Sequence, residues 1–227
     1  IAMKNILKIM LMMITIFTIA GSAVYAAEIP VSDQDQLITS RDWTEISNLQ
    51  DEMKKEEPDA TIDYDKALKV YVDCNLIKLQ TADTKKLTSA LESANYVWVI
   101  PFKMEKTYGM FTVAKGLPLS EEAKSVLTKA EQEEVKNHAG KWMITETAEH
   151  TVEPYYDILL EKREALSDCT RVVLVGSQPG MRQPVALGMD DETARIWISL
   201  GYQYPVMEKI PETQNVESGV YSFDSVA

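Results

Sequence analysis

The most distinctive candidate for chemistry is the loop at residues 176–184, whose sequence is Gly-Ser-Gln-Pro-Gly-Met-Arg-Gln-Pro. It follows an apolar segment that predicts a strand, and ligand-binding loops often lie at the ends of such strands. The side chains of Ser177, Gln178 and Arg182, with backbone N–H groups near Gly180, could hold a carboxylate or a phosphate. However, the loop lacks the Lys-Ser/Thr pair of a P-loop and does not match the Gly-x-Ser-x-Gly nucleophile elbow. A plain connection between two strands is the simpler interpretation.

His150 is the second candidate, because it is one of only two histidines and follows Glu149 at the end of a predicted strand. Glu146 or Glu153 could join it around a metal ion, but no zinc-binding spacing such as His-Glu-x-x-His occurs. We therefore expect neither a metal nor a cofactor. The other histidine, His138, lies near the end of a predicted helix, where an imidazolium interacts favourably with the helix dipole.

Neighbouring carboxylates are the third source of candidate chemistry. They occur at Asp63 and Asp65, at Glu121 and Glu122, and at residues 190–192. Two carboxyl groups that converge on one cleft can hydrolyse a glycoside, but surface carboxylates are normally solvated, and spacing along a sequence does not show convergence. The catalytic residues therefore stay unknown. A secreted hydrolase that uses carboxylates with His150 or Ser177 is the alternative function.

Cys74 and Cys169 are the only cysteines, and an even number in an exported chain favours a disulfide. Cys74 directly follows a predicted strand at 67–73, and Cys169 precedes one at 171–176. If these strands are antiparallel neighbours, the two sulfur atoms can meet. If the strands are parallel, the cysteines lie at opposite ends, and their Cα atoms cannot come within the ~7 Å that a disulfide needs unless the flanking loops fold back. We favour the antiparallel arrangement with a bridge, and two buried free thiols are the alternative.

Apolar periodicity predicts the helices and strands that position these groups. Helices are expected at 41–56, 84–94, 128–139 and 154–166. Strands are expected at 67–73, 96–104, 110–115, 141–148, 171–176, 184–190 and 194–200. Thr128 and Glu131 have the spacing of a capping box, and Gly140 is typical of the position that follows a helix.

These elements predict an α+β fold over residues 40–201. We expect one domain with a mixed, largely antiparallel sheet of about six or seven strands, and three or four helices mainly on one face. The order strand, helix, strand, strand begins at residue 67 and again at 141, so two strand–helix–hairpin units are an alternative description.

The first 26 residues predict a secretory signal peptide. Lys4 and Lys8 supply its positive charge, residues 9–20 are almost wholly apolar, and Val24-Tyr25-Ala26 suits a signal peptidase. Cleavage before Ala27 would leave no membrane span, whereas an uncleaved segment would act as an anchor. We expect residues 27–39 to be a loose lead-in and residues 202–227 a weakly ordered, polar, acidic tail.

Charge and composition narrow the function. The 227 residues include 23 Lys and Arg against 35 Asp and Glu, a net charge of −12. Such an acidic chain is a poor ligand for nucleic acid, whose binding depends on basic side chains. Since no complete catalytic motif is present, we expect a secreted or cell-envelope protein that binds a protein, a peptide or a cell-surface component without catalysis. Its oligomeric state is left open.

Overall fold

The computed structural model of the chain describes residues 29–150, 153–176, 184–201 and 219–225. The expected signal peptide therefore lies outside the described residues, as do Ser177, Gln178, Gly180 and Arg182 of the predicted ligand loop. None of the helices in the described ranges has the length and apolar character needed to cross a bilayer.

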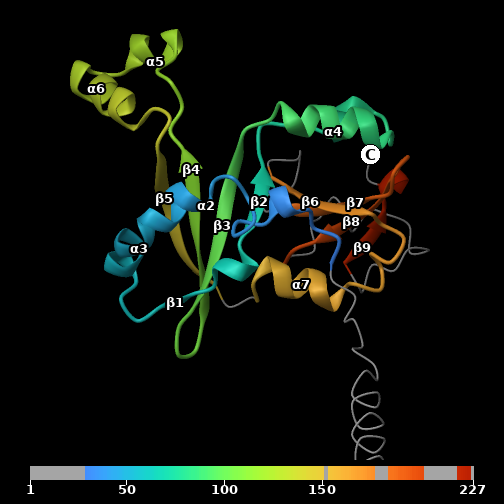
Figure 1. The fold of residues 1–227 in the computed structure, drawn as a ribbon. Coiled ribbons are helices and arrows are strands. Elements are labelled where there is room, and N and C mark those ends of the chain that lie inside the picture. Colours follow the sequence, from blue (N-terminus) through green and yellow to red (C-terminus); the bar gives the residue numbers. More distant parts are fainter. Residues whose placement is uncertain (1–28, 151–152, 177–183, 202–218, 226–227) are drawn as a thin grey trace, which may run out of the picture.

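The described residues form one mixed sheet and several short helices (Figure 1). The strands are β1 (Thr61–Ile62), β2 (Leu68–Tyr71), β3 (Tyr96–Lys103), β4 (Tyr108–Lys115), β5 (Trp142–His150), β6 (Arg171–Val175), β7 (Val185–Met189), β8 (Ala194–Ser199) and β9 (Val220–Ser222). The α-helices are α2 (Trp43–Ile46), α3 (Gln50–Glu56), α4 (Thr84–Glu92), α5 (Glu121–Val126), α6 (Lys129–His138) and α7 (Tyr155–Glu161).

The sheet has the strand order β5-β4-β3-β2-β6-β7-β8-β9, with β1 beside β3. The pairing between β2 and β6 is parallel, and the other pairs of named strands are antiparallel. The expectation of an α+β fold with a mixed sheet is therefore confirmed. The expected strand number is too low, because the short strands β1 and β9 give no periodic signal.

The two expected strand–helix–hairpin units are not built alike. In the first, β2 and β3 are neighbours joined through α4. In the second, β5 pairs with β4, and three strands separate it from β6. The similar order of elements along the sequence therefore does not produce a similar arrangement in space.

Helices cover both faces of the sheet, rather than mainly one as expected. Ile46 of α2 and Met53 of α3 pack with Trp98, Phe102 and other side chains of β3 and β4. Helix α4 and helix α7 lie on opposite sides of the strands β6, β7 and β8 (Figure 1). The buried side chains therefore form three core clusters, and the one beneath α7 extends from β8 to Val99 of β3 and Met110 of β4.

Both segments that were expected to be loose contribute to the core. In the lead-in, Ile29 and Leu37 are buried, and so is the carboxylate of Asp35. In the expected tail, Tyr221 and Phe223 are buried, and the Phe223 ring stacks on Trp197 with 5.4 Å between the ring centroids. A few apolar residues in a polar sequence were enough to attach each segment, which hydropathy alone does not show.

The disulfide prediction is wrong because β2 and β6 are parallel. Val70 lies opposite Leu174, so Cys74 follows the end of one strand and Cys169 precedes the start of the other. No disulfide joins the two cysteines, which are buried and part of different core clusters. Burial raises the pKa of each thiol to about 11, so both groups are protonated at neutral pH.

Helices α5 and α6 form an arm that projects beyond the ends of β4 and β5 (Figure 1). Neither helix contains a buried residue. The predicted capping box is confirmed, since the Thr128 side chain accepts from Glu131 N–H while the Glu131 carboxylate accepts from Thr128 N–H. At the base of the arm, Gly140 N–H donates to Gly116 O at 2.8 Å. A side chain at Gly116 would collide with the chain, because its Cβ would lie 2.1 Å from His138 O.

Candidate functional site

The described residues next to the predicted catalytic candidates lie far apart in the sheet. His150 lies in β5 in the same cross-strand row as Lys103 of β3. Gly176 is the last described residue before the predicted ligand loop, and its N–H donates to Tyr71 O at 2.8 Å. Tyr71 of β2 lies opposite Tyr96 of β3, so this end of the loop is in the cross-strand row of Tyr96. The rows of Tyr96 and Lys103 are seven residue steps apart along β3, or ~23 Å. The described backbone therefore does not support a site that joins His150 with the loop after β6.

The neighbouring carboxylates serve ordinary structural roles. Lys66 lies between Asp63 and Asp157, with the shorter contact, 2.8 Å, to Asp157. The Asp190 side chain accepts from the N–H groups of Thr193 and Glu192, and these bonds lower the pKa of its carboxyl group. In the described part of the chain, no group of three or more His, Cys, Asp or Glu side chains is placed to hold a metal ion.

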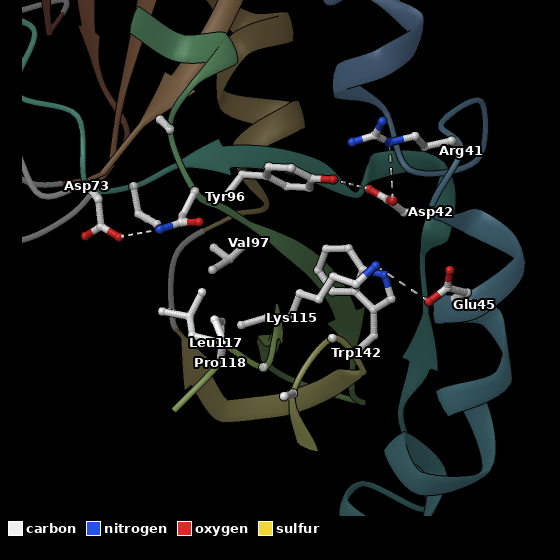
Figure 2. Close-up of a pocket in the computed structure, with 17 residues that line it drawn as sticks. Arg41, Asp42, Glu45, Asp73, Tyr96, Val97, Lys115, Leu117, Pro118 and Trp142 are labelled. Atoms are coloured by element: carbon white, nitrogen blue, oxygen red, sulfur yellow. Dashed lines mark hydrogen bonds and ion pairs between the residues drawn. The ribbon is translucent and has the colours of Figure 1, made fainter. Parts of the chain in front are cut away.

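A pocket of about 790 Å³ lies at the base of the arm instead (Figure 2). We name it the Tyr96 pocket after the residue that begins β3. Its apolar and aromatic lining includes the side chains of Tyr96, Trp142, Leu117 and Val97. The charged side chains that line it are those of Arg41, Asp42, Glu45, Asp73 and Lys115. A pocket with apolar walls and few polar groups is the usual form of a ligand site.

Asp42 fixes the wall of the Tyr96 pocket. Its buried carboxylate accepts a hydrogen bond from the Tyr96 hydroxyl at 2.8 Å and from Trp98 Nε1–H at 3.1 Å. Arg41 Nε lies 3.8 Å from the other oxygen of the same carboxylate. Burial raises the pKa of Tyr96, so its hydroxyl keeps the proton that it donates. The segment before α2 is thereby held against β3.

Trp142 carries a buried hydrogen-bond donor, its indole Nε1–H, beside the pocket. The residue is 7% exposed, and its indole Nε1–H has no acceptor among the described residues. Lys115 Nζ lies over the indole ring, 5.4 Å from its centroid, and 3.9 Å from the Glu45 carboxylate. A buried donor without a partner is destabilising by about 1 to 3 kcal/mol. Because this atom is itself buried, the carbonyl oxygen of a ligand could satisfy it only where the neighbouring side chains move to admit the ligand.

Asp73 lies at the opposite end of the pocket from Glu45 (Figure 2). Its backbone has a φ of 59°, which is uncommon for a residue other than glycine, although Asp and Asn adopt it more readily than most. Asn95 Nδ2–H donates to its carboxylate at 3.1 Å. The turn and this hydrogen bond together hold the carboxylate at the rim.

A second pocket of about 420 Å³ shares Arg41, Asp42 and Tyr96 with the first. Its wall contains Lys69, whose Nζ lies 3.5 Å from the deeply buried Asp35 carboxylate. Lys69 also lies 4.7 Å from the centroid of the Tyr96 ring. Burial lowers the pKa of Lys69, and the Asp35 charge acts in the opposite direction.

Asp35 also accepts from Arg171 Nη2–H at 3.0 Å and from the Tyr71 hydroxyl at 2.7 Å. One carboxylate thus compensates two cations, the buried Lys69 and the partly buried Arg171. Buried ion pairs with several hydrogen bonds are most often structural, and this one attaches the segment before α2 to β2 and β6. We therefore assign the Asp35 network to the framework of the site.

No motif or spacing in the sequence identifies this site directly. Tyr96 and Trp98 stand in the strand phase that predicts a core face, but Asp35 and Asp42 look like ordinary surface carboxylates. Their partners lie far away in the chain: 136 residues separate Asp35 from Arg171, and 54 separate Asp42 from Tyr96. Only the fold brings these residues together.

Comparison of the chain with protein-family models, with curated proteins and with solved structures found no match.

Proposed function

We propose that this chain is a non-catalytic binding module that acts outside the cytoplasm and holds a peptide segment of a partner protein in the Tyr96 pocket. The proposal of export is based on the features of residues 1–26. The proposal of binding is based on the pocket, and above all on Trp142, whose buried Nε1–H has no acceptor in the described part of the chain.

A peptide suits this pocket better than a purely apolar molecule. The rings of Tyr96 and Trp142, 5.9 Å apart between centroids, offer apolar contact to a side chain. The indole N–H of Trp142 requires an acceptor, which a peptide carbonyl provides. The volume of about 790 Å³ lies within the range of small-ligand sites, about 300 to 1,000 Å³, and so can hold a few residues.

The neighbouring arm adds to the proposed surface. Leu117, on the stem of the arm and in the pocket wall, is 59% exposed. An exposed leucine beside an aromatic pocket is a suitable contact for an apolar side chain of the partner. Since Leu117 is not part of the core, its replacement can test binding without unfolding the protein.

The test is an array of immobilised nonapeptides probed with the purified chain, in three forms. We expect the unchanged chain to bind a subset of peptides, Leu117→Asp to lose that binding, and Val126→Asp to retain it. Val126 is a matched control because it is apolar, 79% exposed and on the arm, but it does not line the pocket. If no peptide binds, or if Leu117→Asp binds the same peptides equally well, the proposal is wrong.

A further inference from the structure

We infer that the Tyr96 pocket recognises a cationic side chain, Arg or Lys, of its peptide ligand. This inference rests on the proposed function and names the chemistry of the ligand. It comes from the charges around the pocket, the position of Asp73 and the apolar surface between them.

The pocket has an uncompensated negative charge. Three carboxylates line it, on Asp42, Glu45 and Asp73, against two cations, on Arg41 and Lys115, so the sum is −1. Arg41 lies 3.8 Å from Asp42, and Lys115 lies 3.9 Å from Glu45. Among the described residues, no Lys or Arg forms an ion pair with Asp73. The third carboxylate is therefore available to a cation of the ligand.

The surroundings of Asp73 favour an extended basic side chain. Its carboxylate is oriented by Asn95, and it lies at the rim, where water and a ligand can reach it. Tyr96 and Val97 lie between Asp73 and the end of the pocket that Glu45 and Trp142 form (Figure 2). Long basic side chains commonly place their methylene groups on an apolar surface and their charge at its edge. An Arg or Lys of the ligand can therefore contact Val97 and Tyr96 and end at Asp73.

The pocket already accommodates a lysine of the chain itself. Lys115 places its ammonium group over the Trp142 ring and near Glu45, at the end of the pocket opposite Asp73. The same combination of an aromatic ring and a carboxylate suits a cation. The net charge of the whole chain, −12, also attracts a basic peptide over longer distances.

The test uses three acetylated and amidated pentapeptides, Ala-Leu-X-Leu-Ala, in which X is Arg, Gln or Glu. Each is titrated into the ¹⁵N-labelled chain and followed by NMR, which detects weak binding. We expect the Arg peptide to bind about five-fold more tightly than the Gln peptide, the change that about 1 kcal/mol produces, and the Glu peptide to bind most weakly.

Two variants assign this preference to one carboxylate. Asp73→Asn should abolish the difference between the Arg and Gln peptides, because Asn tolerates the same backbone angle but has no charge. Asp51→Asn is the control: it removes one negative charge from an exposed position outside the pocket and should keep the preference.

The outcomes separate the two proposals. If Arg and Gln peptides bind equally, or Asp73→Asn keeps the preference, the inference of a cationic ligand is wrong while the pocket remains a binding site. If none of the three peptides binds, or if Leu117→Ala, which removes the apolar contact without adding a charge, does not weaken the binding that occurs, both proposals are wrong.

Discussion

The Tyr96 hydroxyl donates a hydrogen bond to the Asp42 carboxylate at 2.8 Å, and this bond joins two parts of the pocket lining that come from distant segments of the chain. Tyr96 begins β3, whereas Asp42 directly precedes α2. Because Trp98 donates to the same oxygen, the carboxylate is held by two rings of one strand. The pocket therefore has a rigid wall on this side, and a ligand can bind without ordering it.

The Asp35 network should be essential for stability. Asp35→Asn removes the charge that forms ion pairs with both Lys69 and Arg171. We expect the free energy of unfolding, measured by urea titration, to fall by about 3 to 5 kcal/mol. Asp33→Asn, two residues earlier and exposed, should change it by less than about 0.5 kcal/mol. A loss below about 1 kcal/mol for Asp35→Asn would contradict the network.

The two cysteines should be free thiols. Because β2 and β6 are parallel, Cys74 and Cys169 lie at opposite ends of that pair of strands. A thiol-specific reagent should therefore count two thiols per chain after denaturation without reductant, and almost none in the native protein. A count of zero after denaturation would show a disulfide and contradict the parallel pairing.

The thiols should also make stability depend on pH. The pKa of each is raised from 9.0 to about 11 by burial. Between these values the unfolded chain loses the thiol protons while the folded chain keeps them, so stability is complete below pH 9 and falls as pH rises towards 11. Each thiol should contribute a loss of about 2 to 3 kcal/mol over this window.

Tyr71 and Lys69 titrate in the same region with opposite effects, since burial raises the pKa of Tyr71 and lowers that of Lys69. The comparison must therefore isolate the cysteines. The double variant Cys74→Ala, Cys169→Ala should lose less stability than the unchanged chain between pH 8.5 and pH 11. Equal losses in the two proteins, measured by urea titration, would show that the thiols are not protected.

Export can be tested directly. Lys4, Lys8, the apolar run at 9–20 and Val24-Tyr25-Ala26 predict cleavage after Ala26. N-terminal sequencing of the protein after export should therefore begin at Ala27. An exported chain that still carries residues 9–20 would indicate that this segment is retained as an anchor.

Elements with a local signal could be predicted from the sequence. The alternation of Tyr96, Trp98, Ile100 and Phe102 gave β3, and the Thr128–Glu131 spacing gave the cap of α6. In contrast, the direction of β6 relative to β2 depends on the path of the chain between them, which no local pattern encodes. For the same reason the expected disulfide is wrong, since the parallel pairing puts Cys74 and Cys169 at opposite ends of the two strands.

The site was harder to predict than the fold. The Tyr96 pocket combines the starts of β3 and β5, the end of β4 and the segment around α2. None of these pieces has a motif, so only their juxtaposition identifies the site.

The indole N–H resonance of Trp142 tests the binding proposal most directly. The chain has four tryptophans, and Trp142→Phe identifies the peak that belongs to this residue. On addition of the Arg pentapeptide, we predict that the Trp142 peak shifts downfield as its N–H gains an acceptor. The Trp197 peak should stay in place, because its indole N–H, also without a described partner, lies in a different part of the core from the pocket. A saturating peptide that leaves the Trp142 peak unchanged would contradict the proposed function.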